Sequence, residues 1–368
     1  MDSPGLYIHI PFCKSRCIYC GFYSTTRLDL RQRYVDAVCR EYQQTRTRLA
    51  FDGTPHTIYI GGGTPSTLTG DQLRQLFDTV GAAEEVTIEC NPDDVTTDFA
   101  KLLSQLPVNR VSMGVQTFNE QRLRFLCRRH TAAQAVEAVT RLRSIGIDNV
   151  SIDLMYGFPE ETLAEWNSDI DQALRLDVEH ISAYALTYEE GTPLWKMLQR
   201  GQVSEIDEDM SRQMYYGLCD RLEENGYEHY EISNFARPGR RSRHNSGYWN
   251  QTSYIGLGAA AHSYDGKCRR WNVSDFVAYI EGVENGCAPY DSEEIDNITR
   301  YNEMVMTALR TADGLPLNSL AAEQRTYCLD NARRYIENGL LSLEADRLRL
   351  TRCGLFVSDM IMTDLMMA

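Results

Sequence analysis

The sequence of 368 residues has no long apolar run, and nowhere do eighteen apolar residues follow one another as in a membrane-spanning helix. It is also poor in positive charge. With 37 Lys and Arg against 52 Asp and Glu, the net charge is -15, whereas a protein that binds along nucleic acid needs a cationic surface. The first residues, MDSPGLYIHIPF, carry an acid where a signal peptide would be basic. We therefore predict a cytoplasmic protein that does not bind nucleic acid.

The sequence also lacks the evenly paired cysteines of a disulfide framework. It has eleven cysteines, an odd number. We expect those that are scattered singly to be small buried hydrophobic residues, namely Cys39, Cys90, Cys127, Cys219, Cys268, Cys287, Cys328 and Cys353. The other three form one constellation, CKSRCIYCGF, in which Cys13, Cys17 and Cys20 are followed by Phe22.

Short β-rich runs alternate with helix-like segments over the first half of the sequence. The runs are LYIHI (6–10), TIYI (57–60), VTIEC (86–90), RVSMGV (110–115), VSIDLM (150–155) and HISAYAL (180–186). The segments between them carry the apolar period or the capping signals of helices. This alternation predicts a parallel sheet, and six units are two short of a closed eight-stranded barrel. We therefore predict an α/β fold, a partial (β/α)6 barrel with its chemistry at the C-terminal ends of the strands.

From about residue 290 the pattern changes to two helical segments followed by an apparent hairpin, LLSLEADRLRL. This order predicts a small C-terminal helical domain that is winged-helix-like. We accordingly divide the chain into a barrel domain with its extension, residues 1–290, and a C-terminal domain, residues 291–368. Asn297 to Ala368 contains eight Arg or Lys and nine Asp or Glu, which favours a lid or packing module over a DNA-binding domain.

The cysteine loop is suited to an iron–sulfur cluster. Three thiolates in one short loop can each bind a different iron of a cubane, which leaves the fourth iron without a protein ligand. A structural zinc site is the weaker alternative, because it needs four ligands and no second Cys or His pair with ligand spacing occurs in the sequence.

Cys13, Cys17 and Cys20 match the CxxxCxxC signature of the radical S-adenosylmethionine (SAM) superfamily, in which an aromatic residue commonly precedes the third cysteine, as Tyr19 does here. The context is similar too, because the loop follows the first predicted strand and GGGTP (61–65) follows the second. Alone, this glycine run could be an ordinary strand-to-helix turn, since it lacks the P-loop and GxGxxG signatures. Beside such a loop it resembles the backbone cradle for the methionine amine of SAM.

Further sequence motifs resemble the family of oxygen-independent coproporphyrinogen III oxidase and the heme chaperone HemW. The resemblance covers nearly the whole chain, and the motifs are YIHIPFC, GGGTPS, ECNP, SMGVQTF, IDLMYGFP and YEISNFA. The resemblance implies a [4Fe-4S] cluster, and SAM bound by Tyr7, Gly62, Gly63, Thr64, Glu89, Gln116, Arg128, Asp153 and Thr187. Acids, an amide and an arginine suit the ammonium, hydroxyls and carboxylate of SAM. Burying a carboxylate without a partner costs free energy, so Asp153, in an apolar strand, is expected to contact the ligand. Alternatively, Asp153 could be a core acid in a salt bridge.

Two departures separate this chain from the oxidase of that family. The oxidase has a further cysteine where Phe22 stands, and a long arm ahead of the first strand, whereas Tyr7 lies almost at the start here. Core packing behind the cluster is the other explanation of Phe22. A third feature also favours the heme chaperone over the oxidase, because HNSGYW (244–249) fits the HNxxYW motif that distinguishes the chaperone.

The HNSGYW segment has the residue types of a heme contact. His244 could bind the iron, and Tyr248 and Trp249 could stack on the macrocycle. The preceding RPGRRSR could pair with the propionates, or be a solvated loop. A single histidine can equally be a polar residue with its hydrogen bonds satisfied.

The resemblance therefore predicts a heme chaperone that binds heme, carries the cluster and SAM, and transfers heme to an acceptor, which the family implies to be a respiratory protein. The main alternative is a coproporphyrinogen dehydrogenase that uses a 5′-deoxyadenosyl radical. A tRNA-modifying radical protein fits the cluster but not the acidic C-terminal region. Enzyme activity, a homodimer and peripheral membrane association stay open.

Overall fold

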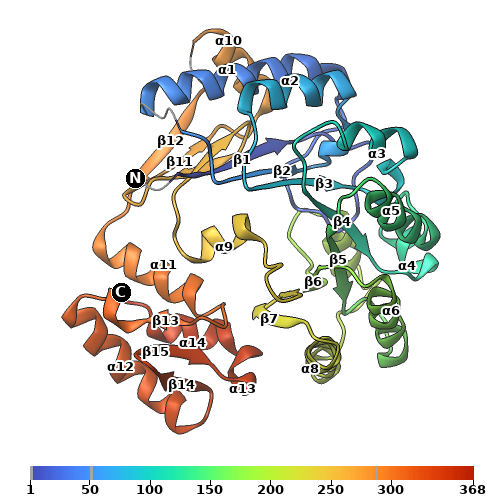
Figure 1. Cartoon of the computed structure of the whole chain (residues 1–368). Coiled ribbons are helices and arrows are strands. Elements are labelled where there is room, and N and C mark those ends of the chain that lie inside the picture. The colour runs from blue at the N-terminus through green and yellow to red at the C-terminus, as the bar shows by residue number, and fades with distance from the viewer. Residues whose placement is uncertain (1–2, 50–52, 287) are drawn as a thin grey trace.

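The computed structural model describes residues 3–49, 53–286 and 288–368. Within this part a 12-stranded sheet runs in the order β12-β11-β10-β9-β1-β2-β3-β4-β5-β6-β8-β7. Its centre is the predicted parallel sheet, formed by β1 (Gly5–Ile10), β2 (Thr57–Gly62), β3 (Glu85–Cys90), β4 (Arg110–Gln116), β5 (Asn149–Tyr156) and β6 (His180–Ala185). The sheet curves into an open arc with helices on its outer side (Figure 1). The predicted α/β partial barrel is confirmed.

The outer helices begin where the sequence carries capping residues. They are α1 (Arg31–Leu49), α2 (Gly70–Val80), α3 (Thr97–Leu103), α4 (Glu120–Phe125), α5 (Ala132–Ser144) and α6 (Leu163–Leu176). Thr69, Thr131 and Thr162 each form a capping box with the residue three places on, which satisfies two backbone donors at each helix start. These caps fix where each strand-to-helix connection ends, and so which residues remain at the rim of the barrel.

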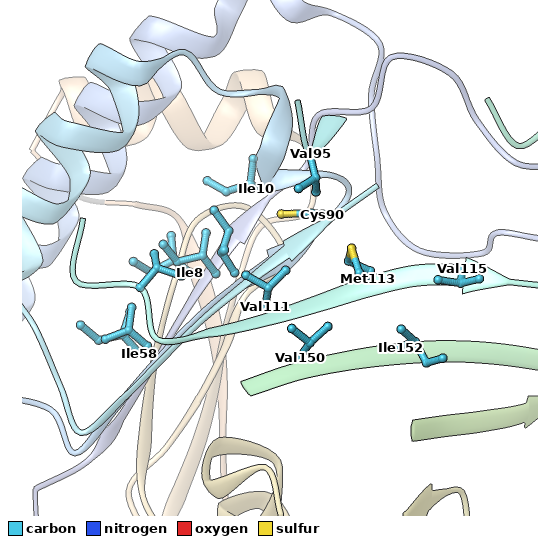
Figure 2. Packing of buried hydrophobic residues seen from close by; sticks show 14 of the residues in the cluster. Ile8, Ile10, Ile58, Cys90, Val95, Val111, Met113, Val115, Val150 and Ile152 are labelled. Carbon is cyan, nitrogen blue, oxygen red and sulfur yellow. The ribbon is translucent and has the colours of Figure 1, made fainter. Parts of the chain in front are cut away.

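Side chains alternate between the two faces of the arc. Those on the outer face are apolar and fully buried against the helices, including Ile8, Ile58, Val111 and Ile152 (Figure 2). Each such side chain stabilises the fold by roughly 1.5–3 kcal/mol relative to exposure. The concave face carries Tyr7, His9, Thr57, Tyr59, Glu85, Thr87, Glu89, Arg110, Ser112, Ser151, Asp153, His180 and Ser182. Because this face is polar, the barrel interior is built to hold polar groups.

Both edges of the arc are extended by strands that the sequence analysis did not predict. Beyond β1 lie β9 (Tyr254–Leu257), β10 (His262–Tyr264), β11 (Cys268–Asn272) and β12 (Tyr290–Glu294), and beyond β6 lie β8 (Asn234–Ala236) and β7 (Glu228–Glu231). The further helices are α7 (Pro193–Gln199), α8 (Glu208–Glu224), α9 (Arg243–Trp249) and α10 (Phe276–Glu284). A buried carboxylate on α1, that of Glu41, holds the first extension by accepting from Gly258 N and Asn272 Nδ2 at 2.9 and 2.7 Å.

The C-terminal part has a hydrophobic core of its own, around residues such as Tyr301, Val305, Cys328 and Leu348. It contains α11 (Asn297–Ala308), α12 (Ala322–Glu337), α13 (Arg352–Leu355), α14 (Ser358–Leu365) and the antiparallel sheet β13 (Leu315–Pro316), β15 (Arg347–Leu350) and β14 (Leu341–Glu344). The predicted hairpin is β14–β15. The predicted division at residues 290/291 falls inside β12, and this boundary stays a prediction.

The expectation that the single cysteines are buried is correct for Cys39, Cys90, Cys219 and Cys328. It is wrong for Cys127 and Cys353, which are exposed, and for Cys268, which is half-buried. Cys127 occupies the turn after α4 with φ 59°, and Cys353 lies on the short helix α13, so neither faces a core. Cys287 lies outside the described residues. Among the described helices, none has the length and apolarity needed to cross a membrane.

Candidate functional site

The three predicted cluster cysteines lie half-buried in the loop that follows β1. Backbone bonds fasten this loop, since Cys13 N donates to Thr25 O at 2.9 Å and Ile18 N to Leu126 O at 3.3 Å. Burial raises the pKa of the Cys13 and Cys20 thiols, and the neighbouring Cys17 raises both further. The three thiols are therefore close enough to influence one another.

The thiols suit a cluster better than a single ion. In the part of the chain that the structure describes, no three His, Cys, Asp or Glu side chains converge on one metal position. The ligands of a cubane each meet a different iron, so they do not need to converge. The guanidinium of Arg128 donates from Nη1 to Cys17 Sγ at 3.6 Å, which places a positive charge beside the three cysteines. The residues thus fit a [4Fe-4S] cluster.

The glycine run after β2 lies directly against the cysteine loop. Gly63 N donates to Ile10 O at 2.8 Å, and Thr64 Oγ1 lies 3.5 Å from Cys13 Sγ. A Cβ at Gly63 would lie 2.8 Å from the backbone carbon of Pro11. Gly62 has φ 112°, which favours glycine, and its added Cβ would lie 2.5 Å from the His9 ring. Only glycine lets these two backbones approach so closely.

Two carboxylates face the concave side beside this run. Burial raises the pKa of Glu89 to about 7, although Glu89 accepts from Tyr59 OH at 2.7 Å and from Gly62 N at 3.0 Å. Burial likewise raises the pKa of Asp153 to about 6, against the opposing effects of Ser182 and nearby arginines. The protein itself compensates these two negative charges incompletely, which suits a ligand that brings an ammonium group and hydroxyls.

The other predicted SAM residues are Tyr7 on β1, Gln116 at the end of β4, Arg128 after α4 and Thr187 after β6. Arg128 donates from Nη2 to Asn91 Oδ1 at 2.7 Å and also contacts Gly114 O. Gln116 is buried, and its φ of 67° accompanies an irregularity in the pairing of β4 with β5. Tyr7 OH lies 2.9 Å from His9 Nδ1. Thr187 is exposed in the loop after β6.

The HNSGYW segment forms α9, which lies in the concavity of the arc (Figure 1). Glu85 fixes its start by accepting from Arg243 N and His244 N, both at 3.0 Å. His244 is 3% exposed, with Nδ1 2.8 Å from Thr57 Oγ1 and Nε2 2.9 Å from Tyr248 OH. Burial lowers the pKa of His244 to about 3, so the ring is neutral. Iron ligation through Nε2 of His244 would displace the Tyr248 hydroxyl, while Nδ1 could keep its contact with Thr57.

Comparison with known proteins agrees with this geometry. The model of the Radical SAM superfamily matches residues 7–173, and that of the HemN C-terminal domain matches residues 295–357. The protein named heme chaperone HemW from Mycobacterium tuberculosis is 35% identical over 98% of this chain and 94% of its own length. HemW from Bacillus subtilis is 36% identical, with 84% of each chain covered. This chain belongs to the HemW family of radical SAM proteins.

A solved structure supports the fold. Coproporphyrinogen III oxidase (HemN) from Escherichia coli superposes with a TM-score of 0.84 over 99% of this chain and 90% of that one. The two sequences are only 21% identical, so this likeness concerns the fold alone. It agrees with the large curved sheet and the C-terminal domain described above.

Phe22 does not fill the core of this HemW family member. Its side chain is 73% exposed, so core packing behind the cluster is the wrong explanation. Two of the arginines near α9 form ion pairs in this structure. Arg237 pairs with Asp177 at 2.5 Å, and Arg243 pairs with Glu84 at 2.5 Å. The Trp249 ring lies beneath Arg310, whose Cζ is 5.2 Å from the ring centroid.

Sequence reasoning missed Tyr59 and Arg110 on the concave face. Arg110 is 1% exposed, and its Nε and Nη1 have no hydrogen-bond partner among the described residues. It pairs in register with Thr87 and Asn149, each of which also has a buried polar atom without a partner in the described part. The alternation of polar residues in the predicted strands was the signal that could have identified this face.

Proposed function

We propose that this chain is a heme chaperone, which binds heme, holds a [4Fe-4S] cluster on Cys13, Cys17 and Cys20 with SAM at the open iron, and transfers heme to an acceptor protein. The relatives named heme chaperone, with about a third of their residues identical, support this. One structural observation carries the proposal. The HNSGYW helix packs on Tyr59, whose hydroxyl donates to Glu89, and so the proposed heme and SAM segments are in contact through one side chain.

SAM would lie along the concave rim. Gly62, Gly63 and Thr64 would bring backbone groups to its methionine end, and Arg128 would hold its carboxylate. Glu89 and Asp153 would accept from its ammonium and hydroxyl groups. Tyr7, Gln116 and Thr187 complete the proposed contacts. When bound, the cluster would supply a low-potential electron.

We propose that heme contacts the HNSGYW segment through His244, Tyr248 and Trp249. The contacts of α9 support different roles in heme binding for these three residues. Trp249 lines a cavity beside the C-terminal domain, while His244 is hydrogen-bonded to Tyr248 and to Thr57 of β2. Iron ligation through Nε2 of His244 would therefore displace the Tyr248 hydroxyl, whereas contact with Trp249 would leave both hydrogen bonds of His244 in place.

The cluster assignment is tested by anaerobic reconstitution of Cys17→Ser. We expect this variant to lose most of its iron, because the cubane loses one of three protein ligands. Cys353→Ser is the matched control, since Cys353 is an exposed cysteine far along the chain, and it should retain the iron of the wild type. Equal iron content in both variants would refute the assignment.

The chaperone function is tested by anaerobic titration of the reconstituted protein with hemin, followed at the Soret band, for wild type and His244→Ala. Saturable binding by wild type is the expected result. If wild type binds no heme but cleaves SAM in the presence of coproporphyrinogen III, the chain is the oxidase and the proposal fails.

A further inference from the structure

The two edges of the 12-stranded sheet differ in how the chain covers them. At one edge, Thr311 of the C-terminal domain forms an antiparallel bridge with Glu231 of β7, and Ile232 N donates to Arg310 O at 3.0 Å. At the opposite edge, β12 pairs with β11 alone and forms the outer border of the sheet (Figure 1). All five residues of β12 are exposed. In the part of the chain that the structure describes, β12 is therefore an uncovered edge strand.

Hydrogen bonds at both ends of β12 determine which of its backbone groups point outward. Val273 N donates to Pro289 O at 2.9 Å. At the other end, Ile295 N donates to Lys267 O at 2.8 Å. Because successive residues of an antiparallel strand direct their backbone groups to opposite sides, the odd-numbered positions from 289 to 295 bond to β11 and the positions between them point away from the sheet. These outward positions are Tyr290, Ser292 and Glu294.

The outward backbone groups are available to another strand. The N–H groups of Tyr290, Ser292 and Glu294 have no hydrogen-bond partner among the described residues. A row of such groups is a template for strand pairing. Main-chain hydrogen bonds to an added strand supply affinity, and the side chains at alternate positions supply specificity. The edge can therefore accept a further strand.

Acidic side chains determine which kind of strand fits. Asp291 and Glu293 point to one face of the sheet, and Glu294 points to the other. Glu293 lies 3.2 Å from Arg269 of β11. Asp291 and Glu294 have no ion pair among the described residues. An incoming strand therefore meets uncompensated negative charge on both faces.

A second copy of this chain fits the edge poorly. If two β12 strands paired antiparallel about Ser292, Asp291 of each copy would lie opposite Glu293 of the other, and like charges placed directly opposite each other are destabilising. Each copy would also bring a net charge of -15. Charged side chains on an edge strand commonly prevent such self-association. The same charges favour a strand that carries Lys or Arg.

We propose that β12 is a docking site for a partner protein, which adds an extended segment rich in Lys and Arg to this edge of the sheet. The backbone of the segment pairs with the outward groups of Tyr290, Ser292 and Glu294, and its cationic side chains pair with Asp291 and Glu294. None of these residues belongs to the proposed cluster, SAM or heme contacts, so the docking surface goes beyond the function proposed above.

The test is fluorescence anisotropy of the full-length protein with a labelled peptide in which two Lys alternate with two Thr, so that both faces of the peptide are cationic. We expect saturable binding that is roughly tenfold weaker in Ser292→Pro, because proline removes one outward N–H and leaves the pairing with β11 and the charge unchanged. The double variant Asp291→Asn and Glu294→Gln should weaken binding by a similar factor. The matched control is Asp71→Asn with Asp209→Asn, on α2 and α8, whose carboxylates are 97% and 75% exposed, and it should bind as wild type does.

Each outcome decides between strand addition and its alternatives. Unchanged binding in Ser292→Pro would show that charge alone attracts the peptide and would overturn the proposal, as would the absence of saturable binding by wild type. The same peptide methylated on its backbone nitrogens keeps its charge but cannot add as a strand, and we expect it not to bind. A wild-type dimer that Ser292→Pro dissociates in sedimentation would place a second copy at the edge and overturn the proposal. Circular dichroism checks that each variant is folded. Because the peptide contains no heme, failure here leaves the chaperone function untouched.

Discussion

The ring of His244 stacks on the ring of Tyr59 with centroids 5.2 Å apart. His244 belongs to α9, whereas Tyr59 belongs to β2 and donates its hydroxyl to Glu89. One tyrosine therefore contacts both the HNSGYW helix and a proposed SAM carboxylate.

Tyr59→Phe is predicted to weaken SAM binding and leave heme binding unchanged. It keeps the ring that stacks on His244 but removes a hydrogen bond that lowers the pKa of Glu89. A larger fraction of Glu89 is then protonated near neutral pH, and we expect SAM affinity to fall several-fold, a factor in keeping with the loss of about one hydrogen bond. Equilibrium dialysis with SAM measures it. Tyr327→Phe, which removes a hydroxyl bonded to Met366 O in the C-terminal domain, is the control.

The stability of the ligand-free protein is predicted to contain a component that decreases as pH rises. The pKa of Glu89 increases from 4.5 to about 7, and that of Asp153 from 3.8 to about 6. The native state therefore retains these protons at pH values where the unfolded chain has released them, and the stability they add at low pH is lost as pH rises through about 6 and about 7. Glu89→Gln should remove the upper part of this dependence. Melting temperatures of both proteins across this range measure the difference, and parallel curves would contradict the prediction.

SAM affinity is predicted to have the opposite dependence on pH. Glu89 and Asp153 accept from a cationic ligand only when they are ionised, so binding should strengthen as pH rises through the same interval. The melting temperature with SAM present should accordingly rise relative to that without it. An interval between the two melting temperatures that stays constant with pH would show that neither carboxylate binds the ligand.

Asp94→Asn is predicted to loosen the cysteine loop. The carboxylate of Asp94 is 2% exposed, accepts from Lys14 Nζ of that loop at 2.6 Å and from Ser66 Oγ at 2.8 Å, and lies 3.1 Å from Arg129 Nη2. Lys14 is partly exposed, so we expect a cost of roughly 1–3 kcal/mol. Faster iron release in air and a lower melting temperature are the readouts. Asp71→Asn serves as the control, because Asp71 pairs with Arg74 but is 97% exposed.

Gly63→Ala is predicted to lower both iron content and SAM affinity. Its Cβ would lie 2.8 Å from the backbone of Pro11, just before the first cluster cysteine, and backbone cannot move aside cheaply. Gly217→Ala is the counterpart, since a Cβ there meets nothing within 4 Å on helix α8, and it should stabilise the protein by about 0.5–1 kcal/mol. Equal reconstitution of both variants would show that the close approach at Gly63 is not needed.

Much of the barrel could be predicted because its signals are local. The apolar alternation in segments such as VSIDLM and the capping residues Thr69, Thr131 and Thr162 each depend on a few neighbouring residues. The outer strands β7 to β12 could not be predicted, because they are short and are stabilised by pairing with strands far away in the sequence. Cys127 and Cys353 were misjudged because residue type alone does not say which side chains a turn or a short helix leaves in solvent.

The sequence by itself indicated the family, the order of the six central strands with the helices between them, and the three cysteines of one loop, because spacing and periodicity are properties of neighbouring residues. Only the tertiary structure decided what HNSGYW contacts. The His244 ring is buried and hydrogen-bonded to Thr57, and Trp249 and Met304 line the same cavity. These contacts join residues far apart in the chain, and they depend on how α9 packs between two domains, which no short stretch of sequence specifies.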